Sequence, residues 1–115
     1  MKKLECIITP HKLDEVRDAL EKLDIRGMTI MEVRGTGCVR GHSSHYRGVE
    51  YNVDLSPKLK LEIVMMDDQV DQVVKTIVGV ARSGRSGKSG DGNSFVSDIT
   101  DIVRIRTGDH GVQAL

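Results

Sequence analysis

The stretch RGTGCVRGHSSHYRGVEYNVDLSPK, residues 34–58, decides how the rest of the chain is arranged. It has no sustained helical or strand periodicity, although strongly patterned segments lie on both sides of it. A structureless run of this length inside a compact domain is usually a functional loop or a disordered linker. Both tyrosines of a chain with one phenylalanine and no tryptophan lie in it, whereas linkers are poor in aromatic residues. We therefore interpret it as a long recognition loop mounted on a small scaffold.

The segment before this loop predicts a strand, a helix and a second strand. Residues 2–9 alternate between apolar and polar, which is typical of a strand. Thr9 as the N-cap and Pro10 at the first helical position predict that a helix follows. Gly27 predicts its end, and residues 28–33 are apolar and β-branched enough for a second strand. The apolar positions behind this pattern are Leu4, Cys6 and Ile8 in the first strand and Leu13, Val16, Leu20 and Leu23 in the helix.

The segment after the loop repeats the same order of elements. Residues 58–66 alternate again, the aspartates at 67–68 predict a helix start, and this helix is expected to end near Ser83. Residues 95–106 then predict a last strand, with an interruption near Asp98. The apolar positions are Leu59, Leu61, Ile63 and Met65 in the strand and Val70, Val73, Val74 and Ile77 in the helix.

This order of elements predicts an α+β fold with a ferredoxin-like double βαβ arrangement, an antiparallel sheet and both helices on one face. The other face would be open, because no further segment of the chain is expected to cover it. Val64, Met65 and their neighbours there predict that another subunit covers it. Within this fold we expect the long loop at 37–55, a glycine-rich loop at 83–93 and a flexible C-terminal tail from residue 107.

Length, charge and cysteine content narrow the class of protein. A chain of 115 residues predicts a single domain over 1–115. Lysine plus arginine equals aspartate plus glutamate, at 17 each, so the bulk charge predicts binding neither to nucleic acid nor to a membrane surface. No segment approaches the roughly 18–20 apolar residues of a membrane span, and Glu5 and Pro10 interrupt what would be a signal peptide. Two distant cysteines predict a reduced, cytoplasmic chain.

Several motifs, in order along nearly the whole chain, resemble the PII signal-transduction protein family (nitrogen regulatory protein P-II). They are MKKLECIITPHKLDEVRDAL at 1–20, GMT at 27–29, GxGxxxGH at 35–42, YRGVEY at 46–51, PKLKLEIV at 57–64, GDG at 90–92 and RIRTG at 104–108. The resemblance implies a homotrimer that binds ATP or ADP in clefts between neighbouring subunits. It also implies that the long loop controls a target transporter or enzyme of nitrogen metabolism, so that the protein senses rather than catalyses.

The resemblance assigns two sets of site residues. Backbone amides of a glycine-rich loop suit phosphate groups, and arginine side chains two apart on a strand would present their guanidinium groups to one phosphate-bearing face. The nucleotide-binding set is Ile7, Gly27, Met28, Thr29, Gly35, Thr36, Gly37, Cys38, Lys58, Glu62, Val64, Gly90, Asp91, Gly92, Asn93, Arg104 and Arg106. The target-binding set is Arg40, His42, Tyr46, Arg47, Glu50 and Tyr51.

Several positions depart from the family pattern. Val39 replaces a glutamine whose amide oxygen helps to hold Mg²⁺ beside ATP, and Mg²⁺ needs hard oxygen ligands. Cys38 replaces a basic residue, and Asn93 replaces the lysine after GDG, which removes a charge-assisted phosphate contact. Lys58 still matches the lysine that pairs with 2-oxoglutarate. Together these changes predict nucleotide binding, leave the role of Mg²⁺ open, and predict weak or absent binding of 2-oxoglutarate in the usual mode.

Alternative interpretations stay open at some of these residues. The run Gly87-Lys88-Ser89 ends like a P-loop, but Arg82 stands where that motif needs glycine. Cys38, His42 and His45 are soft ligands without a recognised spacing or a fourth donor, so we predict no metal site. Tyr51 is either a site of uridylylation or an unmodified contact to the target.

Two other functions compete with nitrogen regulation. A divergent PII-like sensor outside nitrogen control would bind ADP or AMP with bicarbonate or a metal and would regulate carbon or metal transport. A nucleotide-hydrolysing enzyme is the third hypothesis, but no motif places a base or nucleophile.

Overall fold

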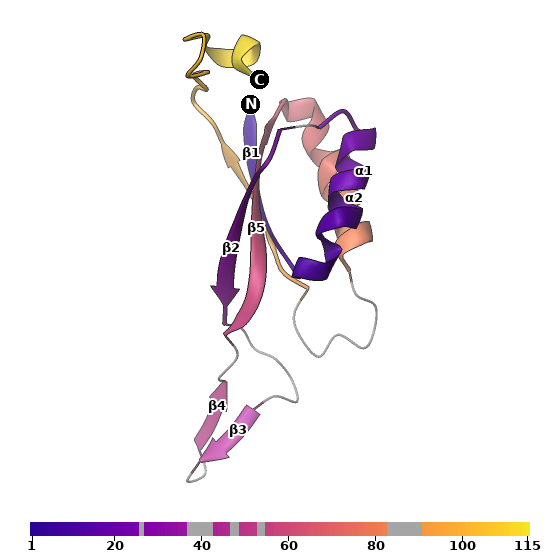
Figure 1. Ribbon diagram of the computed structural model, residues 1–115, viewed down its shortest axis with the longest axis vertical. Coiled ribbons are helices and arrows are strands. Elements are labelled where there is room, and N and C mark those ends of the chain that lie inside the picture. The colour runs from indigo at the N-terminus through magenta and orange to yellow at the C-terminus, as the bar shows by residue number, and fades with distance from the viewer. Residues whose placement is uncertain (26, 37–42, 47–48, 53–54, 83–90) are drawn as a thin grey trace.

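The computed structural model describes residues 1–25, 27–36, 43–46, 49–52, 55–82 and 91–115. Its main body is a four-stranded antiparallel sheet in the order β2-β5-β1-β6, with α1 and α2 on one face (Figure 1). The predicted α+β, ferredoxin-like arrangement is confirmed. The elements are β1 (Lys2–Ile8), α1 (Leu13–Lys22), β2 (Thr29–Gly35), β5 (Ser56–Met65), α2 (Val70–Ala81) and β6 (Ser94–Asp98).

The core lies between this sheet and the two helices. Alternate residues of β1 and β5 face the helices, and each fully buried Leu or Ile contributes about 1.5–3 kcal/mol. The predicted alternation is confirmed in both strands, but Met65 is 1% exposed and belongs to the core rather than to the open face. The buried residues are Leu4, Cys6, Ile8, Val16, Leu20, Ile25, Leu61, Ile63, Met65, Val73, Ile77 and Ala81.

The first helical segment begins where the sequence predicts, with Thr9 as its N-cap residue. A 3-10 turn, η1 (Pro10–Lys12), leads into α1, and Pro10 takes the first position as predicted. The Thr9 side chain makes no capping hydrogen bond; its main-chain carbonyl accepts the Lys12 N–H at 3.0 Å instead. Among the residues that the structure describes, the buried Thr9 hydroxyl has no hydrogen-bond partner. Thr9 therefore takes the predicted N-cap position, but its side chain does not supply the capping hydrogen bond.

The second helical segment also uses a different cap from the one predicted. A 3-10 turn, η2 (Asp67–Gln69), precedes α2, and Met66 is its N-cap. The Gln69 side-chain oxygen accepts the Met66 N–H at 3.0 Å, which is the glutamine half of a capping box. Asp67 instead pairs with the amino group of Met1 at 2.9 Å. The predicted caps at 67–68 are wrong because Gln69 satisfies the start of the turn.

Part of the long loop forms a hairpin that the sequence did not predict. β3 (Ser43–Tyr46) pairs antiparallel with β4 (Val49–Asn52), with Tyr46 opposite Val49. The hairpin projects beyond the ends of β2 and β5 (Figure 1). Short strands with mixed polar residues carry too little alternation to be recognised from sequence.

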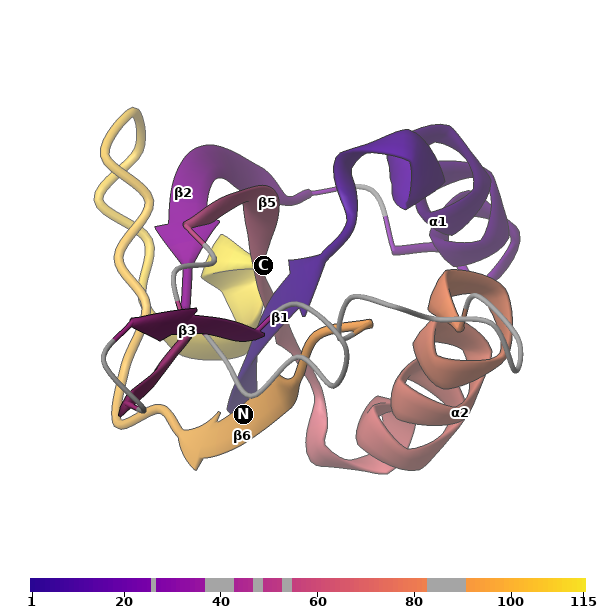
Figure 2. The ribbon, with the colours of Figure 1, turned by 90° about the horizontal axis from the view of Figure 1, so that it is seen from below.

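The C-terminal segment leaves the sheet earlier than predicted. β6 ends at Asp98, so the expected strand over 95–106 is wrong beyond that residue. The chain then folds back, with a bridge between Val103 and His110 and a final 3-10 helix, η3 (Gly111–Ala114). Figure 2 shows this segment on the side of the sheet opposite the helices. The mobility expected from residue 107 stays a prediction.

Among the helices in the described ranges, none is long and apolar enough to cross a membrane.

Candidate functional site

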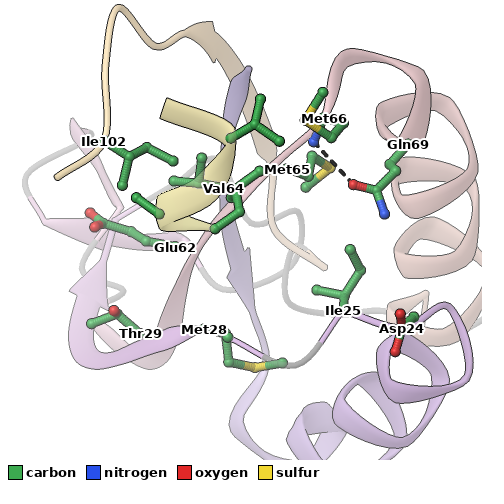
Figure 3. Close-up of a pocket in the computed structure, with 14 residues that line it drawn as sticks. Asp24, Ile25, Met28, Thr29, Glu62, Val64, Met65, Met66, Gln69 and Ile102 are labelled. Carbon is green, nitrogen blue, oxygen red and sulfur yellow. Dashed lines mark hydrogen bonds between the residues drawn. The ribbon is translucent and has the colours of Figure 1, made fainter. Parts of the chain in front are cut away.

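The larger pocket, with a volume of about 1040 Å³, lies where the loop after α1 meets the first residues of β2 and the last residues of β5 (Figure 3). Thr29 and Glu62 are cross-strand partners in the sheet, so their side chains share one face. The other predicted nucleotide-binding residues that line the pocket are Gly27, Met28 and Val64. The structure thus brings together five residues that the sequence assigned to one ligand.

The walls of this pocket are mostly apolar, with a few polar groups between them. Glu62 and Thr29 supply a carboxylate and a hydroxyl, and Gln69 supplies an amide whose oxygen already accepts the Met66 N–H (Figure 3). Concave apolar walls with few polar groups are typical of small-molecule sites. The lining residues that the sequence analysis missed are Asp24, Ile25, Met65, Met66, Gln69, Ile102, Val112, Ala114 and Leu115.

The chain reaches this pocket through an unusual backbone conformation after α1. Asp24 has φ 62°, a left-handed value that few residues other than glycine adopt. The N–H groups of Asp24 and Ile25 donate to the carbonyls of Glu21 and Leu20, each at 3.0 Å, which ends the helix. Ile25 is consequently buried at the edge of the pocket.

A second, smaller pocket of about 420 Å³ holds another part of the predicted set: Ile7, Asp91, Gly92 and Asn93. The Ile7 N–H donates to the Asn93 carbonyl at 2.8 Å, so the end of the glycine-rich loop is fixed against β1. Gly92 has φ +108°, and a Cβ there would lie 1.7 Å from the Ile7 carbonyl oxygen. Only glycine, which has no Cβ, can lie this close to the Ile7 carbonyl.

Cys6 also borders the smaller pocket, but it is structural rather than reactive. Its Sγ lies 2.9 Å from the Ser94 hydroxyl oxygen, and the side chain is 1% exposed. Burial raises the pKa of the Cys6 thiol, and the hydrogen bond to Ser94 only partly opposes that effect. The thiol therefore stays protonated at neutral pH and is a poor nucleophile.

Other predicted nucleotide-binding residues line neither of these two pockets. At the base of the long loop, a Cβ on Gly35 would lie 3.7 Å from the Lys58 Cγ, and Thr36 is exposed beside them. Arg104 and Arg106 are exposed in the folded-back C-terminal segment, not on one face of a strand as predicted, and neither lines either of the two pockets described above.

The rest of the predicted set belongs to the long loop and the glycine-rich run. Tyr46 ends β3, and Glu50 and Tyr51 belong to β4, opposite His45 and Ser44. The residues outside the described ones are Gly37, Cys38, Val39, Arg40, His42, Arg47 and Gly90. The hypothesis of a metal site at Cys38, His42 and His45 therefore falls mostly outside them; the ranges that the structure does describe hold no cluster of three or more potential metal ligands.

Charged side chains connect the larger pocket to the middle of the open sheet face. Glu5 lies opposite Glu62 in the sheet, and the ammonium group of Lys60 bridges the two carboxylates. Lys3 reaches Glu5 at 2.9 Å, while Lys60 lies 3.6 Å from both Glu5 and Glu62. The hydrogen bond from Lys3 is the main reason that the pKa of Glu5 is lowered. The pocket carboxylate is therefore part of a charge network that spans two strands.

Comparison with known proteins gives a consistent answer. The family model for Nitrogen regulatory protein P-II matches residues 1–109. The chain is 50% identical over 115 residues to Nitrogen regulatory protein P-II of Pasteurella multocida (strain Pm70), covering 100% of both chains. It is 55% identical over 76 residues to Nitrogen regulatory protein P-II of Klebsiella oxytoca and to Nitrogen regulatory protein P-II 1 of Escherichia coli (strain K12), covering 66% of this chain and 68% of each relative. The chain therefore belongs to the nitrogen regulatory protein P-II family.

Proposed function

We propose that this protein is a cytoplasmic signal-transduction regulator that binds ATP or ADP and uses its long loop, residues 37–55, to control a target of nitrogen metabolism. The target would be a transporter or a metabolic enzyme, and no catalysis is required. The observation that carries this proposal is the meeting of Gly27, Met28 and Thr29 with Glu62 and Val64 in one large, mostly apolar pocket.

The division of the candidate residues between two pockets favours a site completed by another copy of the chain. One set lies at the start of β2, and the other set, with Asp91 and Gly92, lies at the glycine-rich loop beside β1. In a homotrimer, the first set of one subunit would face the second set of its neighbour. An adenine base would then contact apolar walls, while loop amides and arginine side chains would contact the phosphates.

Isothermal titration calorimetry with ATP and ADP, each with and without Mg²⁺, tests the proposal. We expect saturable binding of both nucleotides. Glu62→Gln should weaken binding, because the Glu62 carboxylate lines the pocket. Glu32→Gln is the matched control, since Glu32 is exposed on the opposite face of β2 and should bind as the unaltered protein does. If neither ATP nor ADP gives a binding signal, the proposal is rejected.

A second candidate function follows from Val39, which offers no oxygen to a magnesium ion. On this view the protein senses ADP or AMP together with bicarbonate or a metal and acts outside nitrogen control. The same titration, repeated with 2-oxoglutarate, AMP and bicarbonate, separates the two candidates. A nucleotide response that 2-oxoglutarate leaves unchanged and bicarbonate alters would favour the second.

A further inference from the structure

The last residues of the chain border the candidate nucleotide pocket. Val112, Ala114 and Leu115 line it together with Val64 and Ile102, and η3 lies beside Val64 in Figure 3. This arrangement corrects the expectation that no segment of the chain approaches the open face. No residue of η3 is buried, and Val112 and Leu115 remain 60% and 44% exposed. The segment therefore lies against the site without being part of the core.

One arginine of the candidate phosphate-binding pair is held by this same segment. The Arg104 Nη2 donates a hydrogen bond to the main-chain oxygen of Leu115 at 3.0 Å. The Arg104 backbone is also fixed, because its N–H donates to the Asp109 carbonyl at 2.9 Å and its carbonyl accepts the Gly108 N–H at 2.7 Å. With the backbone held, the Nη2 donor that Leu115 occupies must leave that oxygen before it can turn to another acceptor.

A single carboxylate positions the start of this segment. Asp101 accepts the Gly111 N–H at 3.1 Å, and its other oxygen lies 2.7 Å from the His110 Nδ1. Gly111 has φ +66°, which directs the chain into η3, and its N–H also lies 2.9 Å from the Ile102 carbonyl. These are exposed polar contacts, and such contacts exchange with water more readily than buried apolar packing does.

We propose that residues 112–115 compete with the bound nucleotide for Arg104. Without nucleotide, Leu115 holds the guanidinium group; a phosphate group of ATP or ADP, which offers several charged acceptor oxygens to the planar guanidinium group, displaces Leu115 and releases the segment. This inference rests on the proposed nucleotide binding. Its consequence is that nucleotide affinity and the conformation of the C-terminal segment are coupled.

A double-mutant cycle on ATP affinity tests the competition. A stop codon after Gly111 should tighten ATP binding about fivefold or more, which lies at the low end of allosteric couplings. In an Arg104→Ala background the same truncation should change affinity less than about twofold, because the shared partner is gone. Arg106→Ala is the matched control, and there the truncation should still tighten binding. Full-length Asp101→Ala, which loosens the segment without removing it, should also tighten binding and replaces the truncation if that variant fails to fold.

Truncation that leaves ATP affinity unchanged, or weakens it, would overturn the inference. If no variant binds ATP, the proposed function fails, and hydrogen exchange of the Gly111 and Leu115 amides then tests the contact itself. Arg104→Ala should accelerate exchange of both amides at least severalfold, whereas Arg106→Ala should not. Equal exchange in the two variants would overturn the inference independently of any nucleotide.

Discussion

Gly92 fixes the glycine-rich loop to the sheet. It approaches β1 so closely that the Ile7 carbonyl carbon and oxygen would lie 2.7 and 1.7 Å from any added Cβ. The Asn93 carbonyl, one residue further on, accepts the Ile7 N–H at 2.8 Å. One glycine therefore determines how closely the end of the candidate phosphate loop packs against β1.

We predict that Gly92→Ala destabilises the protein by about 2 kcal/mol or more, because the new methyl group collides with backbone and the φ of +108° is strained for alanine. Urea unfolding followed by circular dichroism measures the change. Gly79→Ala in α2 is the matched control: nothing lies within 4 Å of its Cβ position, and alanine there should stabilise the helix by about 0.5–1 kcal/mol. Equal midpoints for the two variants would contradict the prediction.

At the scale of elements, η3 depends on a contact between side chains at either end of the folded-back segment. The pKa of Asp101 is lowered from its ordinary value of 3.8, chiefly by the hydrogen bond from His110, with further contributions from the N–H groups of Ile102 and Gly111. A lowered carboxyl pKa in the folded state means that the contact stabilises the segment above pH 3.8. That stabilisation is lost as the pH falls through the folded-state pKa.

Carboxyl ¹³C NMR should therefore show Asp101 titrating below 3.8, and His110→Ala should move its midpoint upward toward 3.8. Asp67 is the internal control, because the pKa of its carboxyl is lowered mainly by the hydrogen bond from the Met1 amino group. The Asp67 midpoint should not respond to His110→Ala. A midpoint of Asp101 that is identical in both proteins would show that the histidine does not stabilise the carboxylate.

At the scale of the whole molecule, the sheet face opposite the helices is largely open. Lys60 lies at its centre and bridges Glu5 and Glu62, whose side chains are about one quarter to one third exposed, at 27% and 31%. A second copy that covered this face would remove further water from these charges. Each of these charged side chains would then need an oppositely charged partner, because an unpaired charge is costly to bury.

We expect the protein to sediment as a trimer, and Lys60→Glu to dissociate it, because three carboxylates would then be adjacent on the covered face. Sedimentation equilibrium measures the mass. Lys75→Glu makes the same change in net charge at an exposed position of α2 and should leave the trimer intact. A trimeric Lys60→Glu protein would show that this face is not the interface.

The sequence predicts the sheet and helices well because their residues alternate or repeat around one buried face. Leu4, Cys6 and Ile8 could be assigned to the core from their alternation alone, without knowing which residues they contact. The strand beyond Asp98 was predicted wrongly, and Thr9 takes the predicted N-cap position without a side-chain hydrogen bond, because both features depend on contacts that no local pattern encodes. Asp101 meets His110 only once the chain has turned, and Gln69 competes for the cap that the aspartates at 67–68 were expected to provide.

The candidate site is predictable only in part, and for a related reason. Motif resemblance selects Thr29 and Glu62, and the register of β2 and β5 brings them together. Val112 and Leu115 belong to no motif, so their position beside the pocket follows only from the folded-back segment. Apolar residues in a tail expected to be polar and mobile were the one signal that the sequence offered.

The position of β1 in the sheet also determines when the sheet can be completed during protein synthesis. β1 is the first strand to leave the ribosome, yet Lys2 pairs with Met65 on one side and with Asp98 on the other. Both partner strands are synthesised after β1, so the apolar face of β1 stays without its neighbouring strands until β5 and then β6 have been translated. Pairings between such distant segments form late and expose the nascent chain to aggregation. The four-stranded sheet can therefore be completed only after β6 has been translated.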